Sequence, residues 1–109
     1  MLDLTEDDAF RCVDYLTRSA KLDGAARGRM VYYAANLRRV KALEMMGTLG
    51  SVAEREVRAY ASDAYLQAMR DEQNATAEYE ELRALREAAA AKFECWRSLN
   101  SSRRQGIVT

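Results

Sequence analysis

The apolar residues of this chain recur at spacings of three and four over most of its length, which is the periodicity of an α-helix. The alternation of apolar and polar residues that is typical of a half-buried strand does not occur. The first stripe follows Thr5, which can cap a helix, and three acidic residues that complement the positive end of a helix. This stripe consists of Phe10, Val13, Leu16 and Ala20. It predicts a short first helix at about residues 5–21, with the stripe buried.

A second helix is predicted at about residues 24–46. The break before it lies between Lys21 and Gly24, because Asp23 can cap a helix and glycine weakens one. The apolar positions that follow have the 4-3-4-3 spacing of a helix that pairs with another helix. They are Ala26, Met30, Tyr33, Leu37 and Val40. Gly47 to Gly50 then ends the helix, and we expect the second and third helices to form a hairpin.

The third helix begins at the boundary that the sequence marks best. Ser51 to Glu54 has the form of a capping box, and glycines precede it. Nothing obliges the helix to end before about Leu99, and a helix at residues 51–99 would be roughly 70 Å long. Because two shorter helices cannot cover it in a compact monomer, we expect the chain to self-associate. The remaining residues, 100–109, form a basic tail that is expected to be mobile.

Composition supports the helical class and the need for partner helices. The chain has no proline and five glycines, and nineteen of its 109 residues are alanine. A methyl group contributes roughly 0.8 kcal/mol on burial, against about 1.5–3 kcal/mol for a Leu or Phe side chain, so a core built mainly on alanine is weak. We expect an all-α single domain over residues 1–109, with a short helix and a long, coiled-coil-like hairpin, assembled into a homo-oligomer. The expected oligomer interface consists of Tyr79, Leu82, Phe93, Trp96 and Leu99.

The residue content argues against an enzyme, a metal site or a bound cofactor. The chain has no histidine, no recognisable nucleophile turn and no glycine-rich phosphate loop. Cys12 and Cys95 lie far apart and form no CxxC pair, so a zinc site is not expected. The longest uncharged run, residues 45–53, is too short to cross a bilayer, and the acidic N-terminus is unlike a signal peptide. We expect a cytoplasmic protein of a bacterial host cell, without membrane contact.

The formal net charge is zero, but the charges are distributed unevenly. Residues 1–10 contain four acidic residues and no basic one, whereas residues 11–43 contain eight basic and two acidic residues. Fourteen of the seventeen basic residues are arginine, whose guanidinium group forks onto phosphates and carboxylates. The predicted hairpin would gather basic side chains around the Gly47–Gly50 turn, where they could bind phosphates. The candidate nucleic-acid contacts are Arg38, Arg39, Lys41, Arg55, Arg58, Arg103 and Arg104.

Other interpretations of these charges stay open. The basic residues can form a solvated face, and a genome rich in G and C also favours arginine codons. Residues 71–94 contain seven acidic and three basic residues, so this stretch can neutralise the basic residues 11–43 within the fold. Glu54 and Glu56 can do the same at the turn.

Two segments carry a resemblance to a known family. Residues 33–41 contain a Tyr-x3-Leu spacing followed by Arg-Arg-x-Lys, and residues 96–107 end a long helix in a Ser-x-Arg-like segment. With the acidic start of the first helix, this layout resembles small bacteriophage proteins related to the recombination mediator UvsY. The resemblance implies an oligomeric ring that binds single-stranded DNA and helps to load a recombinase. It also implies that the C-terminal helix drives assembly and that the strand is contacted by Arg38, Arg39, Lys41, Arg55 and Arg58.

Two functions follow as expectations. The first is a non-enzymatic, oligomeric protein that binds single-stranded nucleic acid in phage-type recombination or replication. The alternative is a phage-encoded helical protein-interaction module, either an inhibitor of a host protein or an assembly factor.

Overall fold

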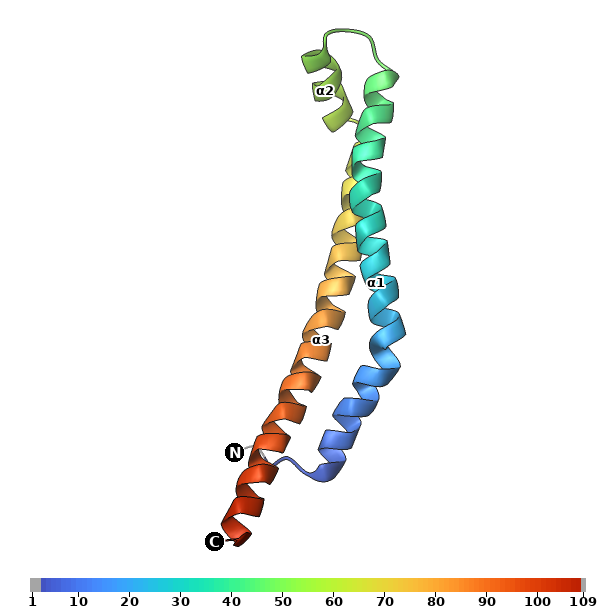
Figure 1. Ribbon diagram of the computed structural model, residues 1–109. Helices are drawn as coiled ribbons and strands as arrows, with labels where there is room; N and C mark the ends of the chain where they lie inside the picture. Colours follow the sequence, from blue (N-terminus) through green and yellow to red (C-terminus); the bar gives the residue numbers. More distant parts are fainter. Residues whose placement is uncertain (1–2, 109) are drawn as a thin grey trace. The chain divides into compact units, whose positions relative to one another are not determined.

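The computed structural model describes residues 3–108 as three α-helices, with no strand in this part of the chain (Figure 1). They are α1 (Glu6–Met46), α2 (Val52–Tyr60) and α3 (Asp63–Val108). The prediction of an all-α fold is therefore confirmed. The described chain divides into two compact units: unit 1 combines residues 3–23 with residues 81–108, and unit 2 consists of Gly24–Glu80. The expected organisation as a single domain stays a prediction.

The predicted break between Lys21 and Gly24 is wrong, because α1 continues through it without interruption. Neither Gly24 nor Gly28 has a positive φ, and each costs a helix only about 1 kcal/mol relative to alanine. Asp23 does not cap a second helix. Its carboxylate instead lies 3.9 Å from Nε of Arg86 on α3, within unit 1. Long-range contacts of this kind hold a helix together where local propensity is weak.

The predicted third helix is also divided differently. It was expected to run from residue 51 to residue 99, but α2 ends at Tyr60 and α3 begins at Asp63. The hydroxyl of Ser62 accepts a hydrogen bond from the amide of Tyr65 (3.1 Å) and so caps the N-terminus of α3. The same hydroxyl donates a hydrogen bond to the carbonyl of Ala59 (2.7 Å) at the C-terminal end of α2. The tail is helical up to Val108, and Thr109 lies outside the described residues.

Two predicted helix starts are confirmed. The Thr5 hydroxyl accepts a hydrogen bond from the amide of Asp8 (3.2 Å), and the Asp8 carboxylate accepts one from the amide of Thr5 (3.0 Å). The Thr5 hydroxyl also donates a hydrogen bond to the Asp8 carboxylate (3.0 Å). The bonds that this carboxylate accepts from the Thr5 amide and hydroxyl lower the pKa of Asp8, the backbone bond being the larger cause. Ser51 accepts a hydrogen bond from the amide of Glu54 (3.2 Å) and caps α2.

Unit 1 is packed on a different face of α1 from the one predicted. The buried residues of its α1 side are Ala9, Cys12 and Ser19, with Leu4 ahead of the helix. The side chains of Phe10 and Val13 are 66% and 42% exposed, so the expectation that their stripe forms the buried face is wrong. Small residues allow two helix backbones to approach closely, and the larger side chains are then left at the edge of the contact.

The contact between α1 and α3 in unit 1 is fixed by a buried polar group. Nη1 of Arg86 donates hydrogen bonds to the carbonyl of Leu16 (2.8 Å) and to the hydroxyl of Ser19, which is only 3% exposed. A buried hydroxyl needs such a partner. Arg86 therefore sets which face of α1 meets α3, and hydrophobicity alone does not reveal it.

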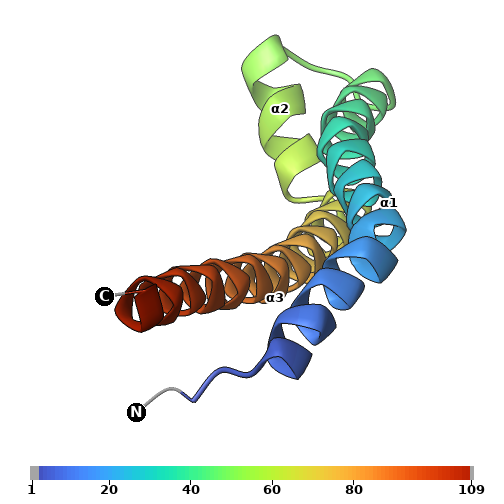
Figure 2. The same ribbon diagram turned by 60° about the horizontal axis from the view of Figure 1, so that its bottom comes forward.

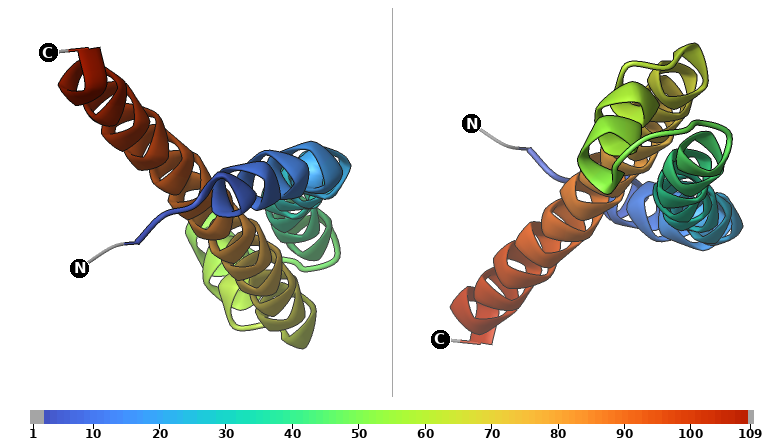
Figure 3. Two further views of the ribbon diagram at one scale, coloured as in Figure 1. Left: turned by 90° about the horizontal axis from the view of Figure 1, so that it is seen from below. Right: turned by 90° about the horizontal axis from the view of Figure 1, so that it is seen from above.

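Unit 2 contains the C-terminal half of α1, α2 and the start of α3, with α2 beside the end of α1 (Figures 2 and 3). The predicted seam of α1 is confirmed, since Ala26 is buried and the other four seam residues are half-buried. Ala59 of α2 and Ala68 and Ala75 of α3 complete the core. No large side chain among the described residues is fully buried. Alanine thus forms most of the buried core, as the composition predicts.

Candidate nucleic-acid interface

Two of the five basic residues predicted around the turn form hydrogen bonds within unit 2. Nζ of Lys41 donates a hydrogen bond to Oε1 of Glu56 on α2 (2.8 Å) and lies 4.6 Å from the centre of the Tyr60 ring. This hydrogen bond lowers the pKa of Glu56 and raises that of Lys41. Lys41 therefore fastens α2 to α1, and its charge is already balanced by Glu56.

The two arginines of α2 differ, because Arg58 is held by a hydrogen bond and Arg55 is half-buried. Nη1 of Arg58 donates a hydrogen bond to the carbonyl of Leu49 (2.7 Å), which holds the guanidinium group at the turn. Arg55 lies one helical turn before the buried Ala59 and is half-buried. Its Nε is a buried nitrogen without a hydrogen-bond partner among the described residues.

Arg38 and Arg39 have a different environment. Both are exposed on α1, and neither forms an ion pair within residues 3–108. Consecutive residues of a helix point about 100° apart, so the two side chains diverge rather than forming one fork. They are the members of the turn set that are exposed and form neither an ion pair nor a side-chain hydrogen bond among the described residues, so their charges stay available to a phosphate backbone.

The acidic stretch 71–94 neutralises the basic stretch 11–43 at one point within unit 2. Arg29 of α1 forms an ion pair with Glu78 of α3. In unit 1 the helices exchange these roles, because α3 supplies the basic residue, Arg86, and α1 supplies the acidic one, Asp23. The neutralisation considered above thus involves Arg29 but does not extend to Arg38 or Arg39.

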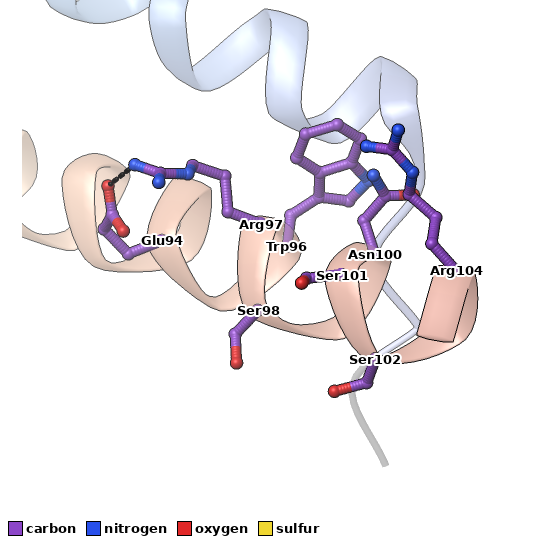
Figure 4. A pocket seen from close by; sticks show the side chains of 8 residues that line it. All are labelled: Glu94, Trp96, Arg97, Ser98, Asn100, Ser101, Ser102 and Arg104. Carbon is purple, nitrogen blue, oxygen red and sulfur yellow. Dashed lines mark hydrogen bonds and ion pairs between the residues drawn. The ribbon is translucent and has the colours of Figure 1, made fainter. Parts of the chain in front are cut away.

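The C-terminal part of α3 carries a hollow in unit 1 with a volume of about 720 Å³. Its lining joins the only tryptophan of the chain to basic and neutral polar side chains. We call Trp96, Arg97, Asn100 and Arg104 the C-terminal surface. Figure 4 shows the Trp96 ring beside the side chains of Asn100 and Arg104. The rest of the lining consists of Glu94, Ser98, Ser101 and Ser102.

The charges of the C-terminal surface favour an anion. Glu94 is the one acidic residue in the lining of this hollow, and its carboxylate lies 3.1 Å from Nη1 of Arg97 (Figure 4). Both side chains are mostly exposed, and such a surface pair contributes only about 0–1 kcal/mol, so a phosphate could displace the carboxylate. Arg103, the other basic residue predicted here, is exposed next to Arg104.

The predicted oligomer interface is only partly covered. Tyr79, Leu82, Phe93 and Trp96 are half-buried, and Leu99 is 36% exposed. The rings of Phe93 and Trp96 stack with their centres 6.2 Å apart. A second hollow of about 270 Å³ lies beside them in unit 1. Its lining is Glu6, Ala9, Phe10, Val13, Phe93 and Trp96.

The sequence prediction missed several residues of these two hollows. Arg97 and Asn100 were not assigned a role. Asn100 follows Trp96 at a spacing of four and so shares one side of a helix with it, whereas Arg97 points about 100° away. That spacing was the available signal. Phe10 and Val13 belong to the apolar stripe of the first predicted helix. Their spacing does not indicate that they line an open hollow.

Comparisons with protein-family models, curated proteins and solved structures found no match to this chain. None of the helices in the described part of the chain has an apolar stretch that could cross a membrane. Within the same residues, no cluster of three or more Cys, Asp or Glu side chains is arranged to hold a metal ion.

Proposed function

We propose that this chain is a non-enzymatic, oligomeric helical protein that binds single-stranded nucleic acid, as a mediator in phage-type recombination or replication. The observation that carries the proposal is the C-terminal surface, where one indole ring shares a hollow with two arginines and an asparagine. Proteins that bind single strands without strong sequence preference combine aromatic stacking platforms with basic groups that follow the backbone.

Each part of the C-terminal surface has a chemical role in this proposal. Trp96 offers a ring face on which an unpaired base can stack, worth about 1–3 kcal/mol per base. Arg97 and Arg104 neutralise phosphates, and Asn100 can donate a hydrogen bond to a phosphate or sugar oxygen. A duplex hides its base faces, so this combination favours a single strand.

Arg38 and Arg39 supply a second set of phosphate contacts in unit 2. One copy of the chain then offers a few available arginines, which gives weak binding. Several copies in one assembly would offer many, and each neutralised phosphate releases counterions and strengthens binding. Oligomerisation is therefore part of the proposed function.

The test is a titration with a short oligothymidylate at salt concentrations between about 50 and 200 mM. Trp96 is the only tryptophan, so its fluorescence should be quenched when a base stacks on it. The double variant Arg97→Ala, Arg104→Ala should bind more weakly, with the slope of log affinity against log salt reduced by about one to two. Arg38→Ala with Arg39→Ala should reduce the slope similarly while leaving helicity unchanged.

The matched control is Arg18→Ala with Arg70→Ala, which removes the same charge from exposed positions outside both surfaces. This control should keep the affinity and the slope of the parent. If the C-terminal variant binds as well as the control, the C-terminal surface is not the binding site. If the parent binds no oligonucleotide even at low salt, the proposed function is wrong.

A second candidate function is a protein-interaction module that binds a recombinase or a host protein. It is favoured by apolar side chains that project into solvent in unit 2, such as Met46 (79% exposed), Leu49 (89%) and Val57 (67%). Exposed apolar groups gathered in one region often mark protein contacts. A parent protein that fails to bind oligonucleotide would leave this candidate in place.

A further inference from the structure

We propose that unit 2 contains a second site for a base of single-stranded nucleic acid, with the ring of Tyr32 on α1 as the stacking platform. This inference rests on the proposed function and deepens it, because it extends the phosphate contacts of Arg38 and Arg39 to a site for a whole nucleotide. We call Tyr32, Asn36 and Arg39 the Tyr32 site. All three residues belong to the part of α1 that lies in unit 2.

The ring of Tyr32 is open to solvent and is held by a neighbouring ring. Tyr32 is 64% exposed and contacts Tyr33 in a T-shaped arrangement, with the ring centres 5.2 Å apart and the ring planes at 81°. A T-shaped contact covers at most one face of either ring, so one face of Tyr32 stays free. Tyr33 is half-buried in the seam of α1 and restricts the movement of the Tyr32 ring. Little conformational freedom is then lost when a base stacks on this ring.

Gly28 leaves space beside the ring for a flat base. It precedes Tyr32 by four residues and so lies on the same side of α1, in the direction in which aromatic side chains on a helix lean. Apart from its two chain neighbours and the nearby backbone of α1, no atom lies within 4 Å of the position that a Cβ of Gly28 would take. The surface over Gly28 is therefore open to a base that stacks on Tyr32.

Polar groups that suit a sugar and a phosphate follow on the same side of the helix. Asn36 lies four residues after Tyr32 and Arg39 lies seven residues after it, which places both on its side of α1. Arg39 is exposed, and its guanidinium group can fork onto a phosphate. Asn36 can donate a hydrogen bond to a phosphate or sugar oxygen. The Tyr32 site thus offers one contact for each part of a nucleotide.

The charges of α1 favour an anion at this site. From residue 24 to residue 43, the helix has five basic residues and no acidic one. On α3, the carboxylate of Glu78 is paired with Arg29, and the carboxylate of Asp71 accepts a hydrogen bond from Gln67 (3.0 Å). A phosphate at the Tyr32 site therefore meets no carboxylate from its own helix.

The Tyr32 site has the same order of side chains as the C-terminal surface. There, Trp96 is followed by Asn100 four residues later and by Arg104 after one further turn. In both places an aromatic ring, an amide and an arginine follow one another along one side of a helix. Aromatic platforms beside basic groups are the combination with which proteins bind single strands, and a duplex hides the base faces that such platforms need. An unpaired nucleotide is therefore the occupant that fits both sites.

Photochemical cross-linking tests which aromatic residues contact a base. The probe is an oligothymidylate in which iodouracil replaces one thymine, because iodouracil attaches to stacked aromatic side chains under ultraviolet light. Trypsin cuts after Lys and Arg, so residues 30–38 form one peptide that contains Tyr32 and residues 93–97 form another that contains Trp96. Mass spectrometry should find cross-links in both peptides, with Tyr32 as the attached residue in the first.

The two peptides separate a failure of this inference from a failure of the proposed function. Cross-links in residues 93–97 without any at Tyr32 would overturn the Tyr32 site and leave the proposed function standing. A parent protein that neither binds nor cross-links to the probe would contradict both.

Affinity measurements give an independent test. Tyr32→Leu keeps an apolar side chain but removes the stacking face, so the affinity for oligothymidylate should fall by about fivefold to a hundredfold at a fixed salt concentration. The slope of log affinity against log salt should stay that of the parent, because a neutral ring neutralises no phosphate. Tyr32→Phe should recover most of the affinity, since stacking needs the ring and not the hydroxyl. Equal affinities of Tyr32→Leu and the parent would exclude stacking on this ring.

A second pair of variants tests the space beside the ring without changing the ring itself. Gly28→Leu and Gly28→Ala both replace a poor helix former by a good one, so both should fold, and circular dichroism checks this. Only leucine fills the open space, so Gly28→Leu should bind oligothymidylate more weakly than its matched control Gly28→Ala. If the two variants bind equally well, a base does not occupy the surface over Gly28 and the proposed site is wrong.

Discussion

Gly50 adopts a backbone conformation that residues with a side chain rarely adopt. Its φ is 127°, and a Cβ atom added there would lie 2.7 Å from Oε2 of Glu54. The carboxylate can move aside, so backbone strain of about 1–3 kcal/mol would be the main cost of any other residue. The sequence marks this position by the pattern Gly-x-x-Gly-Ser, which predicts a turn and a cap but not which glycine carries the strain.

We expect Gly50→Ala to lower the free energy of unfolding by about 1–3 kcal/mol. Urea denaturation followed by circular dichroism measures this change. Gly28→Ala is the control, because Gly28 is helical with open space around it, and alanine favours a helix by about 0.8–1 kcal/mol over glycine. The two variants should therefore shift stability in opposite directions, and shifts of the same sign would contradict this explanation.

The pair formed by Lys41 and Glu56 makes the contact between α1 and α2 depend on pH. Glu56 has a folded pKa below its usual 4.5, so its contribution is complete above about pH 4.5 and is lost as the pH falls through the folded value. Lys41 has a folded pKa above its usual 10.5, so its contribution is complete below that value and is lost as the pH rises through the folded one. The pair stabilises the contact throughout the range between these limits.

We expect Glu56→Gln to flatten the fall of the melting temperature between about pH 5 and pH 3, because the variant has no carboxylate left to protonate. It should also melt at a lower temperature than the parent at pH 7. Glu81→Gln removes an exposed carboxylate of α3, and its melting temperature should fall in acid as that of the parent does. If both variants lose stability in acid as steeply as the parent, Glu56 is not the group responsible.

At the scale of the helices, the sequence predicted correctly that these segments are helical but predicted the helix bounds poorly. Thr5, Ser51 and the 4-3-4-3 seam of α1 carry local signals, because a cap or a stripe involves neighbours in the chain. The continuity of α1 through Gly24 was missed because glycine inside a helix costs only about 1 kcal/mol. The contacts of Arg86 with Ser19 and Asp23 join residues more than sixty positions apart, so no local pattern indicates them. Ser62 followed by Asp63 is a local signature of a helix start that could have placed the break before α3.

Arg86 is the residue that joins α1 to α3 in unit 1. We expect Arg86→Met to lower the free energy of unfolding by about 1–3 kcal/mol, because the buried Ser19 hydroxyl loses a charged partner while the aliphatic stem is retained. Arg18→Met is the matched control, since Arg18 pairs only with the exposed Asp14 one turn away. Denaturant unfolding of both variants tests this, and equal losses would contradict a special role for Arg86.

At the scale of the whole molecule, the buried side chains are mostly small. Alanine provides five of the seven buried apolar residues of the described chain, while Phe10, Leu49 and Val57 are mainly exposed. The sequence predicted a weak core and a partner helix from its alanine content. It could not predict which apolar side chains would stay exposed, because Phe10 and Val13 have the same spacing in the chain whether they face the core or the solvent.

We expect the melting temperature of the parent to rise with protein concentration, because association stabilises the folded state by mass action. Phe93→Ala with Trp96→Ala removes the two largest side chains of the predicted oligomer interface and should weaken this dependence. Leu22→Lys changes an exposed side chain outside that interface and should behave as the parent does. Scanning calorimetry over a hundredfold range of concentration makes the comparison. A concentration-independent melting temperature in the parent would contradict association in the folded state.

The two units differ in how far along the chain their parts lie from one another. Unit 2 is a continuous segment, whereas unit 1 joins the first residues described to the last ones across that segment. Closing a longer loop costs more entropy, and contacts distant in sequence slow folding. Unit 2 should therefore form first and unit 1 last. During synthesis, Phe10 and its neighbours would leave the ribosome well before Phe93 and Trp96 exist, and the α3 segment of another copy could reach them first. Exchange of that segment between copies is thus a built-in hazard of this chain order.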